Sequence, residues 1–88
     1  MKTVNWNADK AKLLKETREI ELERVALMIE EKELLAVAKV QNRDQMMFIL
    51  DYDDYIVCVP FIETEDEIFL KTAYRNRKFN KLLKGEES

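Results

Sequence analysis

The sequence contains no histidine and a single cysteine, Cys58. The lack of histidine excludes Ser-His-Asp and Cys-His nucleophilic systems, histidine-ligated zinc and imidazole acid–base catalysis. A single cysteine allows neither an internal disulfide nor a cysteine metal site, and we expect Cys58 to be an inert core thiol. Any catalysis must therefore use carboxylates, lysine, arginine, tyrosine or backbone groups.

The sequence also has only one glycine and one proline, which leaves little room for linkers or low-complexity segments. Its 88 residues, of which 47% are apolar, suffice for one globular domain. We therefore expect a single domain over residues 1–88, with 85–88 as a flexible tail.

Long hydrophobic runs are missing as well. The longest, Tyr55–Ile62, is interrupted by Pro60 and is far shorter than the ~20 residues that a membrane helix needs. Residues 1–12 lack the apolar stretch of a signal peptide. We expect a soluble, cytoplasmic protein that does not interact with membranes.

The formal net charge of −3 is unevenly distributed. Residues 71–84 contain no acid and carry +6, so the rest of the chain carries −9. The acidic total argues against a nucleic-acid-binding protein, whereas the basic segment argues for one. The cations of this segment are Lys71, Arg75, Arg77, Lys78, Lys81 and Lys84.

An acidic turn, formed by Asp51, Asp53 and Asp54, is the only segment that looks like a metal loop. It lacks the glycine and the downstream glutamate of a calcium-binding loop, and position 62 is isoleucine. We expect neither a metal nor a cofactor.

The first third of the chain is predicted to form a short strand, Lys2–Trp6, and two helices. Asn7 suits the N-cap of the first helix, whose buried face would hold Ala8, Ala11 and Leu14. The second helix has apolar residues at i, i+3, i+4 and i+7, namely Leu22, Val25, Ala26 and Ile29. Ile20 and Leu22 do not continue the helical spacing of the apolar face of the first helix, so we predict two helices rather than one.

The remaining pattern is mostly strand-like. We predict strands over Leu34–Val40, Met46–Tyr52, Tyr55–Ile62 and Ile68–Tyr74. The middle two are apolar on both faces and flank a polar turn, which indicates a hairpin at the centre of a sheet. Pro60 has no backbone donor and should lie near a bulge or the end of pairing.

A short helix is predicted over Arg77–Lys84, ended by Gly85. The element order is then β-α-α-β-β-β-β-α. Short turns between consecutive strands indicate an antiparallel sheet of about four to five strands, so the predicted fold class is α+β, with two N-terminal helices and a short C-terminal helix.

Two segments resemble BrnT-type toxins of bacterial type II toxin–antitoxin systems. Val4–Lys12 resembles that family's first strand, which ends in tryptophan and leads into a helix with an early lysine. Ile68–Lys78 resembles the family's last strand and its basic exit. The resemblance implies a RelE-like fold and a cytoplasmic ribonuclease toxin that a ribbon-helix-helix antitoxin neutralises.

The resemblance also suggests residues for metal-independent RNA cleavage. Such cleavage needs in-line attack by the 2′-hydroxyl, loss of its proton and stabilisation of charge on the phosphate. Arg75 and Arg77 are implied as phosphate binders, because a guanidinium bonds two phosphate oxygens at once. Lys71 and Tyr74 are implied as helpers in proton transfer.

Four further residues are candidates for RNA binding: Trp6, Arg43, Lys78 and Lys81. Trp6 would either stack a base beside a cation or anchor the first strand in the core. Arg43 would either reach the phosphate site from its loop or remain an ordinary surface arginine.

Two other functions stay open. One is a RelE-like binding module without catalysis. It would suit the acidic net charge of the chain and the presence of Tyr74 at a position where many BrnT-type toxins have arginine. An unrelated α+β interaction domain is the other alternative, because sheet strands that are apolar on both faces can leave a patch for a partner. The expected partners are a cognate antitoxin, RNA that is free or on the ribosome, and a second copy of the chain.

Overall fold

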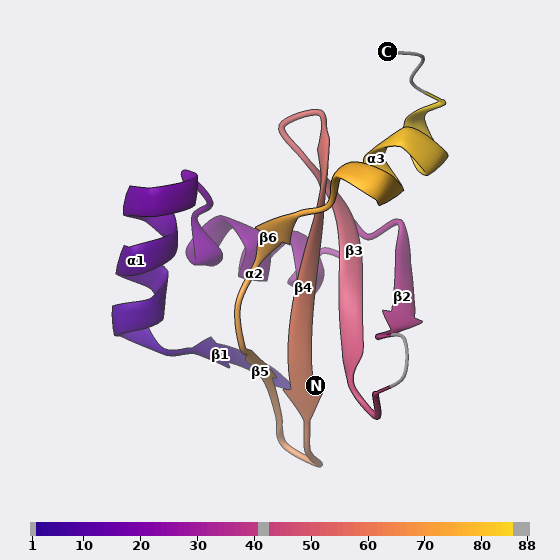
Figure 1. Ribbon diagram of the computed structural model, residues 1–88. Coiled ribbons are helices and arrows are strands. Elements are labelled where there is room, and N and C mark those ends of the chain that lie inside the picture. The colour runs from indigo at the N-terminus through magenta and orange to yellow at the C-terminus, as the bar shows by residue number, and fades with distance from the viewer. Residues whose placement is uncertain (1, 41–42, 86–88) are drawn as a thin grey trace.

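The structure is a computed structural model that describes residues 2–40 and 43–85 (Figure 1). In chain order the elements are β1 (Thr3–Trp6), α1 (Ala8–Arg18), α2 (Leu22–Glu30), β2 (Ala36–Lys39), β3 (Met46–Tyr52), β4 (Tyr55–Glu63), β5 (Glu67–Leu70), β6 (Tyr74–Arg75) and α3 (Arg77–Lys84). The predicted α+β class is confirmed. Of the predicted tail at 85–88, only Gly85 belongs to the described residues. None of the helices described is both long and apolar enough to cross a membrane.

The sheet has the strand order β1-β5-β4-β3-β2, and β6 pairs with β4 beyond the end of β5. All pairs are antiparallel except β1 and β5, which run parallel. The predicted antiparallel sheet is therefore confirmed except at β1, which pairs in parallel. A short hairpin turn forces antiparallel pairing, but β1 reaches its neighbour only through the rest of the chain, so no turn fixes its direction.

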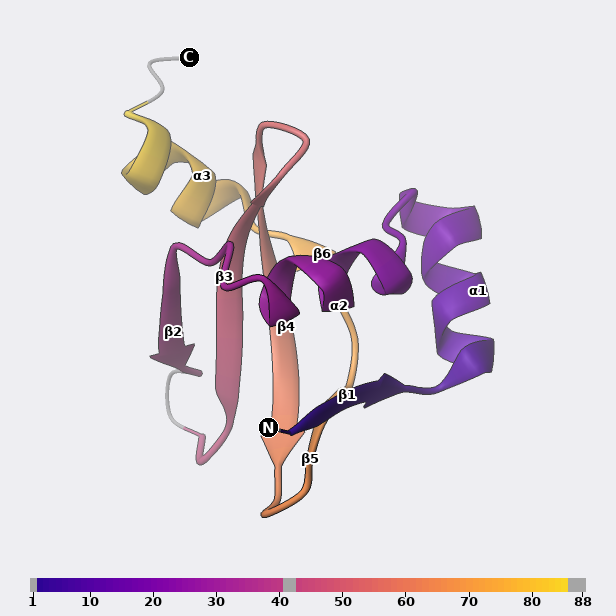
Figure 2. The same cartoon turned by 180° about the vertical axis from the view of Figure 1, so that it is seen from behind.

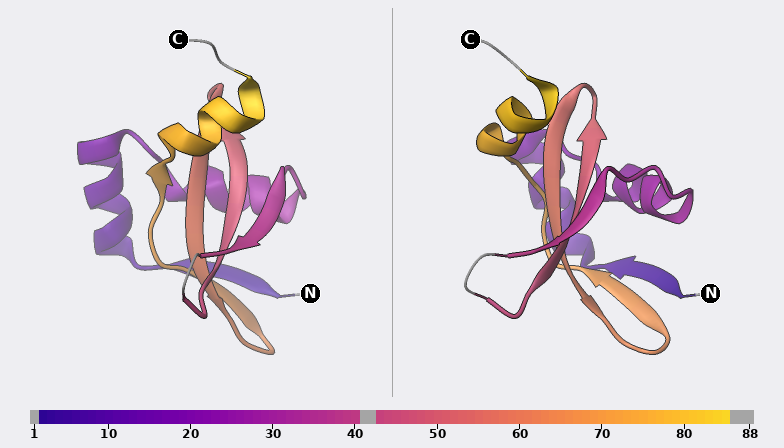
Figure 3. Two further views of the ribbon diagram at one scale, coloured as in Figure 1. Left: turned by 45° about the vertical axis from the view of Figure 1, so that its right-hand side comes forward. Right: turned by 90° about the vertical axis from the view of Figure 1, so that its right-hand side faces the viewer.

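The helices lie on both sides of the sheet. Figures 2 and 3 show α2 across one face and α3 against the opposite face, near the end of the sheet where β3 and β4 turn. The larger core lies on the α1 and α2 side and includes Leu14, Ile20, Val25, Leu50 and Val59. A smaller core lies under α3 and comprises Met47, Ile49, Ile56 and Cys58. Both faces of β3 and β4 are therefore partly covered, as their two-sided apolar pattern requires.

The two predicted N-terminal helices are confirmed. The Asn7 side chain accepts a hydrogen bond from the Lys10 backbone N–H at 3.0 Å and so caps the start of α1. The helix ends at Glu19, whose φ of 56° is left-handed, and this bend separates α1 from α2. The boundary predicted from the apolar spacing of Ile20 and Leu22 is therefore confirmed.

The central hairpin is also confirmed. Tyr52 and Tyr55 are directly paired, and the two residues between them, Asp53 and Asp54, both have positive φ (52° and 69°). Two successive left-handed residues are typical of a type I′ turn, which matches the twist of paired strands. Further along the hairpin, Phe48 and Phe61 stack with their ring centroids 4.0 Å apart.

The predicted last strand, Ile68–Tyr74, is divided in two. β5 ends at Leu70 and β6 begins at Tyr74. On this side of β4, residues 61–63 pair with β5 and residues 57–58 pair with β6, so the partner strand changes beside Pro60. The Pro60 carbonyl accepts a hydrogen bond from Lys71 N–H at 2.9 Å, but proline has no N–H to continue the ladder. Pro60 thus lies at a break in pairing, as predicted, and this break interrupts the strand alternation between 70 and 74.

Candidate nucleic-acid interface

Arg75 lies beside the C-terminal end of α1. It is exposed on β6, where it pairs with Val57, and its Nη1 donates a hydrogen bond to the Arg18 carbonyl. In return, Arg18 Nη1 donates to the Ala73 carbonyl at 2.8 Å. The last carbonyls of a helix carry partial negative charge, so a guanidinium is well placed there. These two contacts join α1 to β6 and bring two arginines together.

A third arginine lies on the same side of the molecule. Arg24 of α2 donates from both terminal nitrogens to the two Asp53 oxygens, at 3.0 and 2.5 Å. Its guanidinium carbon also lies 4.4 Å from the centre of the Tyr52 ring. The Tyr52 hydroxyl accepts from the Glu21 N–H at 3.0 Å, so the start of α2 is held against the hairpin.

Asp53 connects Arg24 with Arg75 electrostatically. The hydrogen bonds from Arg24 lower the pKa of the Asp53 carboxyl, and the positive charges of Arg24 and Arg75 lower it further. We call Arg18, Arg24 and Arg75 the arginine cluster. Among the described residues, Asp53 is the only acid that forms an ion pair with it. The three guanidinium groups of the cluster therefore carry more positive charge than Asp53 neutralises. Guanidinium groups bind phosphate oxygens well.

Tyr74 lies on the opposite face of the sheet from the larger core. Its half-buried ring packs against the smaller core, and its hydroxyl lies 3.8 Å from the Met47 sulfur, a distance that allows a weak hydrogen bond. Burial raises the pKa of Tyr74 and also that of the neighbouring Cys58 thiol. Tyr74 therefore stays protonated at neutral pH, which suits a proton donor and not a base.

Lys71 is held at the other end of β4 from the hairpin turn. Its Nζ donates to Gln45 Oε1 at 3.1 Å, and Gln45 Nε2 donates to the Phe61 carbonyl. Arg43 is exposed on the bend just before Gln45. Arg75 pairs with Val57 of β4, and Val57 pairs with Leu50 of β3. Leu50 lies four residues, or roughly 13 Å, along β3 from Met46, the residue that follows Gln45. The structure thus separates Lys71 and Arg43 from Arg75.

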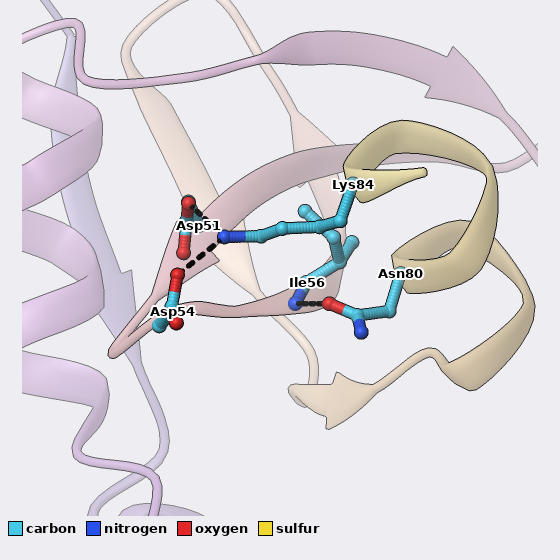
Figure 4. A network of polar contacts seen from close by, with 5 residues as sticks. All are labelled: Asp51, Asp54, Ile56, Asn80 and Lys84. Atoms are coloured by element: carbon cyan, nitrogen blue, oxygen red, sulfur yellow. Dashed lines mark hydrogen bonds and ion pairs between the residues drawn. The ribbon is translucent and has the colours of Figure 1, made fainter. Parts of the chain in front are cut away.

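The basic residues of α3 fall into two groups. Lys84 Nζ contacts Asp51 and Asp54, each at 2.7 Å, and these carboxylates raise its pKa (Figure 4). The other three cations, Arg77, Lys78 and Lys81, are exposed and form no ion pair within 2–40 and 43–85. Positions 77, 78 and 81 share one side of a helix, so α3 presents a basic stripe to solvent.

Trp6 packs against the larger core and is half-buried. It also lines an open groove of about 400 Å³ between β1 and α2, together with Arg24, Glu23 and Glu30. The two carboxylates oppose a nucleic-acid backbone in this groove, and Arg24 is already bound to Asp53. The half-buried position of Trp6 is consistent with an anchor of β1 in the core, one of its two predicted roles.

Of the predicted site residues, the structure brings Arg75 and Arg77 to the same end of the sheet, on either side of Asn76. The sequence analysis did not single out Arg18 or Arg24. No local pattern marks them, because Arg18 and Arg75 are 57 positions apart. No model of a known protein family matches the chain, and no curated protein is significantly similar to it in sequence.

Proposed function

We propose that the protein is an RNA-cleaving toxin of the RelE-like class, from a type II toxin–antitoxin system, and that its RNA site lies at the arginine cluster and the start of α3. The resemblance of Val4–Lys12 and Ile68–Lys78 to BrnT-type toxins suggests the class. One observation supports the site: exposed Arg75 lies beside Arg18 and near Arg24, and within residues 2–40 and 43–85 a single carboxylate pairs with the three.

Arg75 and Arg77 would each contribute phosphate contacts. The 2′-oxygen would attack the adjacent phosphorus, the bond to the 5′-oxygen would break, and a 2′,3′-cyclic phosphate and a 5′-hydroxyl would form. The 2′-hydroxyl proton passes to a base, and the leaving 5′-oxygen takes up a proton. Charge builds on the two non-bridging oxygens, where a guanidinium fork stabilises it. Positioning and charge stabilisation are the contributions that these arginines suit.

Inducible expression in a bacterial host, with growth and newly formed RNA ends as readouts, tests this function. The variants are Arg75→Ala/Arg77→Ala and, as a control with the same loss of charge, Lys12→Ala/Lys15→Ala on the exposed side of α1. We expect arrest and new RNA ends with the wild type and the control but not with the arginine variant. Equal arrest by all three proteins at matched levels would place the site elsewhere.

A specific observation favours a second candidate, a module that binds RNA without cleaving it. Tyr74 and Arg75 are consecutive on a strand and point to opposite faces, and Lys71 lies at the far end of β4. The predicted proton-transfer groups therefore do not share a face and an end of the sheet with Arg75. RNA binding by the folded protein, with no new RNA ends in cells or in vitro, would favour this candidate.

A further inference from the structure

A groove lies between β1 and α2, which lie next to each other (Figure 2). It consists of two adjoining hollows of about 400 and 440 Å³, which share Val4 and Glu30 as lining residues. The apolar side chains that line it are Val4, Trp6, Ala26, Leu27, Ile29 and Ile68. Leu27 is 52% exposed, so the chain leaves part of this apolar surface uncovered. Hollows of about 300–1,000 Å³ are large enough to bind a ligand.

The strand that lines this groove, β1, is at the edge of the sheet. Among the described strands it pairs only with β5. The Thr3 N–H donates to the carbonyl of Asp66, the residue before β5, at 3.1 Å, so Thr3 turns its backbone groups toward β5. Backbone groups alternate in direction along a strand, so Val4 and Trp6 turn theirs away from β5. The two residues of β1 that line the groove therefore offer backbone donors and acceptors to a further strand.

The charge along the groove is predominantly negative. Glu23 and Glu30 are exposed, lie about 10 Å apart along α2 and form no ion pair within residues 2–40 and 43–85. Three cations also line the groove, but Arg24 and Lys2 are held in ion pairs with carboxylates outside it. Lys32, just beyond the C-terminal end of α2, is the third. The groove therefore attracts a cationic partner more strongly than an anionic one.

We propose that this groove binds an extended segment of a partner protein in which an apolar side chain lies between two lysines or arginines. The segment adds to β1 through the backbone of Val4 and Trp6, a mode of peptide recognition in which main-chain hydrogen bonds give affinity. Every second side chain of the segment points to the α2 face. There the apolar side chain contacts Leu27, and the two cations contact Glu23 and Glu30. Charge complementarity of this kind selects the partner and opposes a nucleic-acid backbone.

Fluorescence of Trp6 tests this inference, because it is the only tryptophan of the chain and lines the groove. The probe is an acetylated and amidated peptide, Thr-Lys-Thr-Val-Thr-Lys-Thr, whose lysines and valine share one face when it is extended, with the lysines about 13 Å apart. Titration into the full chain should change the emission of Trp6 and reach saturation. The same peptide with glutamate in place of lysine should bind about tenfold more weakly. An equal response to both peptides, or none up to millimolar concentration, overturns the inference.

Charge reversal in the groove is the decisive control. Glu23→Lys/Glu30→Lys should reverse the preference, so that the glutamate peptide binds more tightly than the lysine peptide. Glu16→Lys/Glu65→Lys changes the net charge by the same amount at exposed positions outside the groove and should keep the wild-type preference. Circular dichroism verifies that each variant is folded. If both variants change the preference equally, net charge and not the groove determines binding, and the inference is overturned. The peptides replace RNA in this test, so its outcome is independent of the proposed function.

Discussion

The Asn80 side chain takes the place of a strand at the end of the sheet. Its Oδ1 accepts a hydrogen bond from the Ile56 N–H at 3.0 Å (Figure 4). The Asn76 N–H donates to the Ile56 carbonyl at 2.9 Å. Beyond β6 no strand continues along β4 in the described chain, so Asn80 of α3 and its N-cap residue Asn76 supply both partners of the Ile56 backbone. Asn80, 6% exposed, is the one buried polar residue among those described.

We expect that Asn80→Leu lowers the free energy of unfolding by about 1–3 kcal/mol, because it leaves a buried N–H without an acceptor. Chemical denaturation followed by circular dichroism measures this. Lys81→Ala, on the exposed side of the same helix, should change stability by less than about 0.5 kcal/mol. Equal losses in the two variants would mean that the Asn80 hydrogen bond contributes little.

The stability of the fold should fall in acid. Hydrogen bonds from Arg24 and Lys84 lower the pKa of Asp53 and of Asp54, respectively. A carboxyl whose folded pKa is lowered adds stability that is fully present above its unfolded pKa of about 3.9 and is lost as the pH falls through the folded pKa. Denaturation at neutral pH and at about pH 3 should therefore show a smaller acid loss for Asp53→Asn/Asp54→Asn than for the wild type. If the variant loses as much stability in acid as the wild type, other carboxyls cause the loss.

Cys58 should react with thiol reagents slowly in the native protein. It is 0% exposed, and burial raises the pKa of its thiol, so both access and the thiolate fraction are low. Because it is the only cysteine, its labelling rate reports opening of the smaller core directly. The rate should rise sharply in denaturant. A native rate equal to the denatured rate would contradict the packing of α3 on the sheet.

Two neighbouring aspartates should differ in their effect on RNA. Asp53 binds Arg24 within the arginine cluster, whereas Asp54 binds Lys84 of α3. Asp53→Asn frees Arg24 for phosphate and should raise RNA affinity up to about fivefold, the scale of an exposed ion pair. Asp54→Asn removes the same charge from the same turn and should raise it less. A reversed order, measured by fluorescence anisotropy, would move the RNA site toward Lys84 at the C-terminal end of α3.

Local signals in the sequence were enough for most elements. The apolar period of Leu22–Ile29, the cap at Asn7 and the polar turn between two apolar runs each act over a few residues, and all three are present in the structure. The break at Pro60 also has a local cause, the missing backbone donor.

The candidate site was harder to predict, because it depends on contacts between distant residues. The side chain of Arg75 donates to the Arg18 carbonyl, and the side chain of Arg18 donates to the Ala73 carbonyl. Nothing in the local sequence of either segment predicts these contacts. The parallel pairing of β1 with β5 has the same long-range origin. An unbroken strand would place Lys71 and Arg75 on one face, because they are four residues apart. The break between Leu70 and Tyr74 interrupts that alternation, and Lys71 lies with Gln45 instead.

The most direct test of the RNA site uses purified protein and a labelled single-stranded RNA, with binding and cleavage followed at several salt concentrations. Removing Arg75 and Arg77 together should reduce the slope of log affinity against log salt by about 1.4, the value for two lost phosphate contacts, and should abolish cleavage. Arg77→Ala alone, which removes no ion pair formed within the part of the chain that the structure describes, should give half of that change. The account is contradicted if the salt dependence and cleavage of both variants match those of the wild type.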